Sequence, residues 1–99
     1  RWRYVRSVLL SSLNMADSGG NNLGLSWTNF VNSYMRRLES NESELRRALN
    51  DLSGSGLILR EENDLLRQDI YRITPLGRDF VMADMPWDRL DRFTGDRLL

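Results

Sequence analysis

The stretch from residue 45 to residue 80 limits the possible folds more than any other part of the chain. Apolar residues at helical spacing come first, and a Gly-Ser-Gly break ends them. Two short aliphatic runs follow, separated by a charged segment, and Thr74-Pro75 comes directly after the second run. Threonine caps the first turn of a helix and proline fits its first position, so this pair indicates a helix start. The order predicts a helix, a strand over 57–59, a hairpin tip over 60–69, a strand over 70–73 and a final helix.

Two more helices are expected before this stretch. Residues 1–15 place aliphatic side chains on one helical face, and residues 17–24 form a loop rich in turn-forming residues. Leu23 and Leu25 fit a short first strand, and Ser26 is a suitable N-cap for the helix that follows. The predicted buried positions are Val5, Val8, Leu9 and Leu13 in the first helix and Trp27, Phe30, Val31, Tyr34, Met35 and Leu38 in the second.

The ends of the third and fourth helices also have sequence signals. Ser40 or Asn41 is expected to cap the third helix, and Gly54 or Gly56 is expected to end it in the left-handed conformation. Pro86 is expected to end the fourth helix. The predicted buried positions are Leu45, Ala48, Leu49 and Leu52 in the third helix and Leu76, Phe80, Val81 and Met85 in the fourth.

Composition restricts the chemistry of the chain. It has no cysteine and no histidine, which removes thiol nucleophiles, Cys/His zinc sites and imidazole acid–base catalysis. The paired carboxylates at Glu61-Glu62 and Asp88/Asp91 fall in a turn and a tail, and no glycine-rich phosphate loop is present. We therefore expect no enzyme, no metal and no cofactor.

The chain is sized for one domain, with 99 residues of which 40% are hydrophobic. No apolar run approaches the roughly 18 residues of a membrane-spanning helix. We expect a cytoplasmic protein without a membrane segment. Because the sequence does not begin with Met, we also expect it to be part of a longer chain.

Three segments invite comparison with a known family: Leu45-Arg-Arg-Ala-Leu49, Gly56-Leu-Ile58 and Tyr71-Arg-Ile-Thr-Pro-Leu-Gly-Arg78. They resemble the winged helix-turn-helix transcription regulators of bacteria and archaea, and the last segment is most similar to the MarR and PadR types. The resemblance covers about residues 25 to 82 and implies a mainly α fold with a small β-hairpin (α+β). The winged helix-turn-helix domain would occupy residues 1–85, and residues 86–99 would be a C-terminal extension that could form a short helix.

The resemblance also implies how DNA would be contacted. The third helix would enter the major groove, and the hairpin, or wing, would touch the DNA backbone or minor groove. Arg46 or Arg47 could form a fork onto guanine and Asn50 could pair with adenine. The implied DNA-binding set is Arg36, Arg37, Asn41, Ser43, Arg46, Arg47, Asn50, Arg60 and Arg67, with Glu42 at the start of the helix and Arg72 as a further phosphate contact of the wing.

Two functions follow from these observations. The first is a sequence-specific transcription regulator that binds double-stranded DNA as a dimer. Its dimer contact would come from the first helix or from the tail 87–99, which begins with Trp87. An effector site could form if Trp2, Trp27 and Trp87 converge.

The second function is a protein–protein interaction module in a larger DNA-associated assembly, such as a chromosome-structuring or replication complex. The predicted hairpin tip favours it, because Glu61, Glu62, Asp64 and Asp69 oppose only Arg60 and Arg67 there. The net charge of zero also favours it, since DNA-binding domains are usually basic. The protein partner would contact the third helix and the acidic hairpin.

Overall fold

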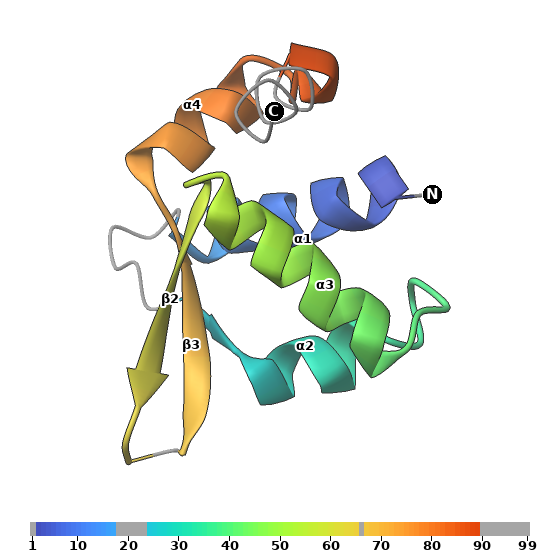
Figure 1. The fold of residues 1–99 in the computed structure, drawn as a ribbon, viewed down its shortest axis with the longest axis vertical. Helices are drawn as coiled ribbons and strands as arrows, with labels where there is room; N and C mark the ends of the chain where they lie inside the picture. Colours follow the sequence, from blue (N-terminus) through green and yellow to red (C-terminus); the bar gives the residue numbers. More distant parts are fainter. Residues whose placement is uncertain (1, 18–23, 66, 90–99) are drawn as a thin grey trace, which may run out of the picture.

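The computed structural model of the chain describes residues 2–17, 24–65 and 67–89, which form helices packed against a small antiparallel sheet (Figure 1). The α+β class expected from the sequence is confirmed. The elements are α1 (Trp2–Asp17), β1 (Leu25–Ser26), α2 (Trp27–Tyr34), α3 (Glu42–Gly54), β2 (Ile58–Asn63), β3 (Gln68–Ile73) and α4 (Pro75–Met82).

The sheet has three strands in the order β1-β3-β2, and both pairings are antiparallel. The short first strand is confirmed at Leu25, which pairs with Tyr71; Leu23 lies outside the described residues. The hairpin ladder runs from the pair Ile58–Ile73 to the pair Asn63–Gln68. The charged segment 60–69 is therefore wrongly predicted as a tip, because most of it is paired strand. The two strands extend beyond the aliphatic residues from which they were predicted. Backbone hydrogen bonds and ion pairs between diagonal positions hold the charged residues of the two strands together.

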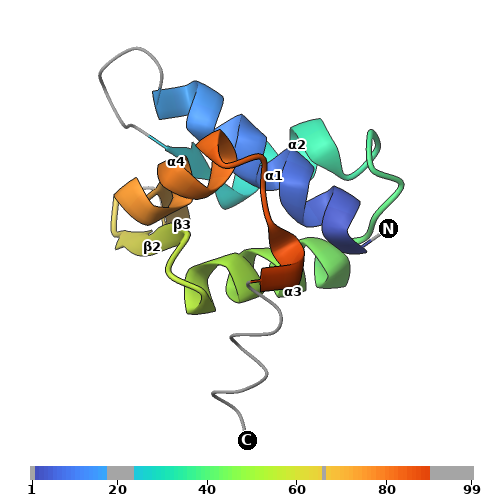
Figure 2. The same cartoon turned by 90° about the horizontal axis from the view of Figure 1, so that it is seen from above.

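The hydrophobic core lies where α1, α3 and the sheet meet. All four buried positions predicted for α3 are confirmed. In α1, Leu10 is fully buried in the core, whereas Val8 is only half-buried. Phe30 from α2 and Tyr71 from β3 join the core in an edge-to-face contact with ring centroids 5.7 Å apart. Figure 2 shows α1 passing through the middle of this arrangement, with α3 on one side.

The three expected N-caps are present. The side chains of Ser26, Asn41 and Thr74 accept hydrogen bonds from backbone N–H groups three residues later, and Pro75 occupies the first turn of α4. At the end of α3, Gly56 takes the left-handed conformation with φ of 79°. The α2 helix ends at Tyr34, before the end of its predicted apolar stripe, because the chain turns into α3 while Leu38 remains buried.

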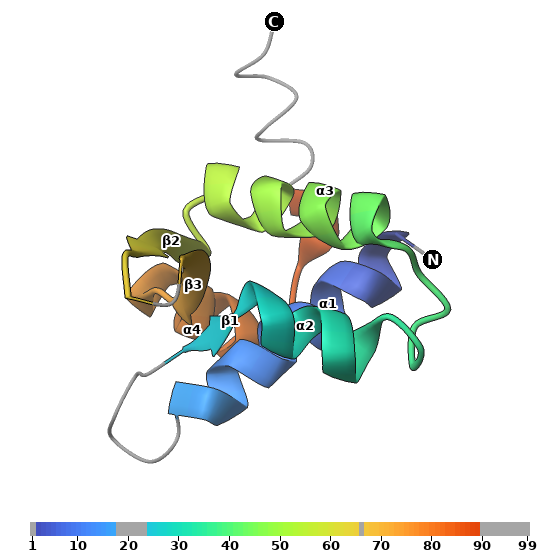
Figure 3. The ribbon, with the colours of Figure 1, turned by 90° about the horizontal axis from the view of Figure 1, so that it is seen from below.

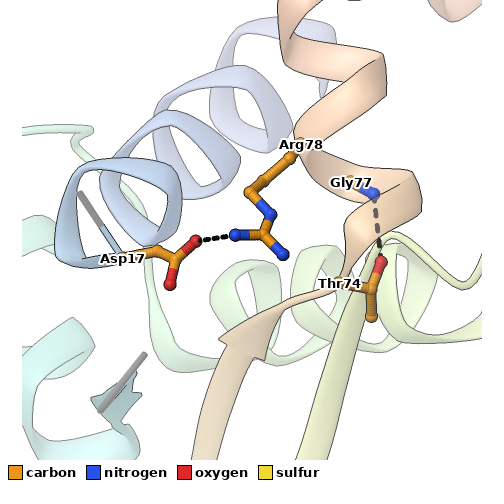
Figure 4. A network of polar contacts seen from close by, with 4 residues as sticks. All are labelled: Asp17, Thr74, Gly77 and Arg78. Carbon is orange, nitrogen blue, oxygen red and sulfur yellow. Dashed lines mark hydrogen bonds and ion pairs between the residues drawn. The ribbon is translucent and has the colours of Figure 1, made fainter. Parts of the chain in front are cut away.

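One buried position of α4 is wrongly predicted. Leu76 is exposed, and Gly77 beside it is buried instead. A Cβ atom on Gly77 would lie 2.0 Å from the carbonyl oxygen of Leu57, so the first turn of α4 packs directly on the backbone before β2. Thr74 strengthens this contact, because its N–H donates to the Leu57 carbonyl at 3.1 Å. Figure 4 shows the Thr74 cap on Gly77 and the neighbouring ion pair between Arg78 and Asp17.

Trp87 connects the end of the described chain to the core. Its ring packs edge-on against Phe80 at 4.7 Å, and its Nε1 donates to the Ser7 hydroxyl of α1 at 2.8 Å. The first residues of the predicted extension, 86–89, are thus attached to the domain. Residues 90–99 lie outside the described residues. Among the helices that the structure describes, none is long and apolar enough to cross a membrane.

We expect Gly77→Ala to destabilise the fold by about 3 kcal/mol, because the new methyl group meets backbone that cannot move aside. Gly54→Ala is the matched control, since a Cβ atom there meets nothing within 4 Å. That control should be neutral or stabilising by up to about 1 kcal/mol. Urea unfolding followed by circular dichroism measures both changes. Equal stabilities of the two variants would contradict the packing described for α4.

Candidate nucleic-acid interface

The exposed side of α3 is the main candidate surface. Ser43, Arg46, Arg47 and Asn50 are all exposed and form what we call the α3 outer face. They lie opposite the leucines that anchor the helix in the core. The structure thus brings together four of the residues predicted to face DNA. Asn41 has a structural use, because its side-chain oxygen accepts from the N–H of Glu44 at 2.9 Å.

Arg46 is held in place by an aromatic ring. Its guanidinium carbon lies 4.4 Å from the centroid of the Trp27 ring, at the start of α2. A cation–π contact of this kind contributes about 0.5 to 2 kcal/mol and limits the rotamers of the arginine. The sequence alone did not indicate this pairing, since Trp27 was assigned to the core stripe of α2. The contact gives one arginine of the α3 outer face a defined position.

A small cleft separates α3 from the hairpin. It has a volume of about 250 Å³, and Arg46 and Arg67 reach it from opposite sides. Thr28 ties the start of α2 to the hairpin, because its N–H and hydroxyl both donate to Oε1 of Gln68, at 2.9 and 2.7 Å. Figure 3 shows α2 starting directly after β1, beside the sheet. The remaining residues of the cleft are Trp27, Gln68, Asp69 and Tyr71.

Tyr71 contributes the most buried side chain of the cleft. Burial raises the pKa of its phenol above the ordinary value of 10.0, and the carboxylate of Asp69 acts in the same direction. Arg60 and Arg46 oppose the shift through their positive charges. The phenol is therefore neutral at physiological pH and can donate a hydrogen bond.

The hairpin arginines differ in their surroundings. Arg72 forms an ion pair with Glu61, and Nε of Arg60 lies 3.8 Å from a carboxylate oxygen of Asp69. Two of the three arginines expected to contact phosphates are thus paired within the hairpin. Arg67 is exposed at the hairpin end, where its φ of 53° is unusual for a residue with a side chain. It has no ion pair with any carboxylate of the described residues.

The arginines of α1 differ from those in the turn before α3. Arg36 and Arg37 are exposed in the turn between α2 and α3, and Arg37 lies over the Tyr34 ring at 5.9 Å. Arg3 and Arg6 are used within the protein, because Arg3 pairs with Asp88 and Arg6 is buried against the Trp87 ring. The turn and α3 together thus carry four exposed arginines, and the same segment carries four carboxylates, at Glu39, Glu42, Glu44 and Asp51.

The convergence of tryptophans that an effector site would require is not seen for the two whose side chains are described. Trp27 contacts Arg46 beside the cleft, whereas Trp87 packs against Phe80 and α1. The side chain of Trp2 lies outside the described part. Among the described residues, no group of acidic side chains is arranged to hold a metal ion.

No protein-family model matches this chain, and neither the curated proteins nor the solved structures include a significant match to it.

Because the pKa of Tyr71 is raised, the free energy of unfolding should decrease at alkaline pH. A folded pKa above the unfolded value near 10 means that unfolding favours ionisation, so stability is complete below about pH 10 and is lost as pH rises further. We expect Tyr71→Phe to reduce this loss, because phenylalanine has no phenol to ionise. Urea unfolding between roughly pH 9 and pH 11 tests this. An identical pH slope in the Tyr71→Phe variant and the unchanged protein would contradict the assignment.

Proposed function

We propose that this chain is a winged helix-turn-helix DNA-binding domain of a transcription regulator. The observation that carries the proposal is the α3 outer face, which presents two arginines and an asparagine on one exposed side of a helix. The order of elements supports it, because α2 and α3 are joined by a short turn and are followed by a β-hairpin. The surface around α3 also has the hydrogen-bonding groups that recognise bases and phosphates.

The chemistry of these side chains suits the major groove of DNA. The groove is about 12 Å wide and admits one α-helix. Arg46 and Arg47 can each donate two hydrogen bonds to guanine, and Asn50 can exchange two with adenine. Stacking on Trp27 reduces the entropy that Arg46 loses on binding, because the side chain is already positioned.

Phosphate contacts would come from the turn before α3. Arg36 and Arg37 are exposed there, next to the first turn of the helix that carries the base contacts. Arginine forks suit phosphate oxygens, and such contacts fix the register of a protein on the duplex. The exposed Glu42 at the start of α3 can accept a hydrogen bond from cytosine, but it also repels phosphates.

The hairpin would contribute less than the resemblance implied. Arg60 and Arg72 already have carboxylate partners, and releasing them to phosphates would leave those carboxylates without a counter-charge. Arg67 is the hairpin arginine placed to reach a phosphate, beside the cleft and across from Arg46. The proposal therefore assigns DNA binding to α3, the preceding turn and Arg67.

We expect the double variant Arg46→Gln/Arg47→Gln to weaken binding to duplex DNA by about tenfold or more, because each lost arginine contact is worth roughly 1 to 3 kcal/mol. The matched control is Arg60→Gln/Arg72→Gln, which changes net charge equally but alters arginines paired within the hairpin. Fluorescence anisotropy with labelled duplex DNA measures both affinities. Equal losses in the two variants would show that the effect is one of net charge and that the assigned face is wrong.

A second function has its own supporting observation, the acidic outer strand of the sheet. β2 lies at the edge of the sheet, and Glu61 and Glu62 are exposed on it. An exposed edge can accept a further strand from another protein, and carboxylates attract a basic partner. The alternative proposal is therefore a protein–protein interaction module in a DNA-associated assembly, such as a chromosome-structuring or replication complex.

Under this alternative, Glu61→Gln/Glu62→Gln should lose a protein partner captured by the unchanged chain, while any DNA binding is retained or improves. The control Glu39→Gln/Asp79→Asn removes the same charge from exposed positions outside the hairpin. Affinity capture followed by mass spectrometry compares the three proteins. A partner that stays bound to the Glu61/Glu62 variant does not use this edge, and the alternative would then fail.

A further inference from the structure

The cleft between α3 and the hairpin has the composition of a site for a small charged group. None of the described residues that line it is aliphatic, and two of them, Arg46 and Arg67, are arginines from different elements. Its volume of about 250 Å³ is below the roughly 300 to 1,000 Å³ of pockets that hold drug-sized ligands. Tyr71, which is almost completely buried, closes the cleft on the side of the core. The cleft is therefore too small and too polar for a large apolar ligand.

Neither arginine of the cleft is used in an ion pair within the part of the chain that the structure describes. Arg46 lies over the Trp27 ring at 4.4 Å. Stacking of this kind uses the flat face of a guanidinium group, whereas the N–H donors lie in its plane. The two guanidinium groups reach the cleft from opposite sides, so both can donate to one acceptor group placed between them.

The carboxylate that lines the cleft already has a basic partner. A carboxylate oxygen of Asp69 lies 3.8 Å from Nε of Arg60. Glu62 and Asp64 line a separate hollow at the end of the hairpin, which Arg67 also borders. On the lining of the cleft itself, two guanidinium groups face a single described carboxylate, and Arg60 partly neutralises that carboxylate. An anion entering the cleft would therefore meet net positive charge.

The backbone of Arg67 gives separate support for a binding role of its side chain. Its φ of 53° lies in the left-handed region, which glycine adopts without steric cost and other residues do not. Residues held in such conformations cluster at binding sites, where the side chain compensates for the strain. The turn alone would favour glycine here, so a ligand of the arginine explains its presence better than the fold does.

We propose that this cleft binds one phosphate group, held between the guanidinium groups of Arg46 and Arg67. Arginine forks match the spacing of phosphate oxygens, and hydrogen bonds between two charged groups are stronger than neutral ones. The phosphate belongs either to the DNA backbone, in which case the inference rests on the proposed function, or to a free phosphate ester. In a DNA complex, Arg46 would then hold the backbone, and recognition of bases would fall to Arg47 and Asn50.

The first test uses inorganic phosphate and does not depend on DNA binding. Two-dimensional NMR of the ¹⁵N-labelled chain is recorded during a phosphate titration, with the ionic strength held constant by sodium chloride. If free phosphate is sufficient, the amide signals of Arg46, Arg67 and Gln68 should shift until they saturate. Arg67→Gly should abolish this saturable shift while its urea unfolding midpoint stays the same or rises, because glycine relieves the left-handed backbone. The control Arg72→Gln, at a paired hairpin arginine outside the cleft, should keep the shift.

The second test determines whether a DNA phosphate occupies the cleft. Affinities of Arg46→Gln, Arg67→Gln and the double variant for mixed-sequence duplex DNA are measured by fluorescence anisotropy at several salt concentrations. If both arginines hold one phosphate, the double variant should lose less affinity than the product of the two single losses. The logarithmic dependence of its affinity on salt should be less steep by about 0.9, the value for one phosphate.

The matched control for the second test is Arg36→Gln/Arg67→Gln, because Arg36 lies in the turn before α3 and outside the cleft. Its two losses should multiply, and its salt dependence should be less steep by about 1.8, the value for two phosphates. The same additive behaviour in the Arg46/Arg67 double variant, together with no saturable shift by inorganic phosphate, would overturn the inference and leave DNA binding in place. A saturable shift identifies free phosphate as a ligand, and a coupled loss on DNA identifies the backbone. A chain that binds no DNA would refute the proposed function, and the phosphate titration alone would then decide the inference.

Discussion

The position of the central strand β3 determines how the candidate surfaces are arranged. It pairs with β1 on one side and β2 on the other, so both the start of α2 and the hairpin depend on it. Its Tyr71 ring is almost completely buried and packs edge-on against Phe30 of α2. Its Gln68 accepts two hydrogen bonds from Thr28. Because α2 also carries Trp27, which positions Arg46, β3 connects the core to the cleft and to the α3 outer face.

The proposed DNA binding by a chain with no net charge depends on how individual arginines are placed. In the hairpin, arginines and carboxylates lie within ion-pair distance of one another, as in Arg72 with Glu61. On α3, Arg46 instead stacks on the aromatic ring of Trp27. Surface ion pairs contribute little to stability, so the main effect of the two hairpin pairs is to occupy Arg60 and Arg72 within the hairpin. Charge is balanced on α3 and the turn before it as well, because Glu39, Glu42, Glu44 and Asp51 offset Arg36, Arg37, Arg46 and Arg47, so DNA binding here would depend on where the arginines lie and not on a local excess of positive charge.

Local signals in the sequence predicted most of the fold, and long-range contacts account for the errors. The caps at Ser26, Asn41 and Thr74 were predictable because each depends on a few neighbouring residues. The burial of Gly77 in place of Leu76 was not predictable from neighbouring residues, because it follows from direct contact with the Leu57 backbone. In the candidate site, the exposed residues of α3 followed from helical periodicity. Two other contacts join separate elements, because Arg46 stacks on Trp27 and Arg72 pairs with Glu61. No local sequence pattern indicates which arginine contacts which partner.

The central claim is that α3 and the turn before it bind DNA through arginines. The most direct measurement is the affinity of the unchanged chain for mixed-sequence duplex DNA, by fluorescence anisotropy at several salt concentrations. If Arg36, Arg37, Arg67 and one α3 arginine neutralise phosphates, the logarithm of the association constant should fall with the logarithm of salt concentration with a slope of about −3 to −4. Absence of binding at low salt would contradict the claim, because non-specific affinity for phosphates underlies specific recognition. Binding that does not respond to salt would contradict it equally.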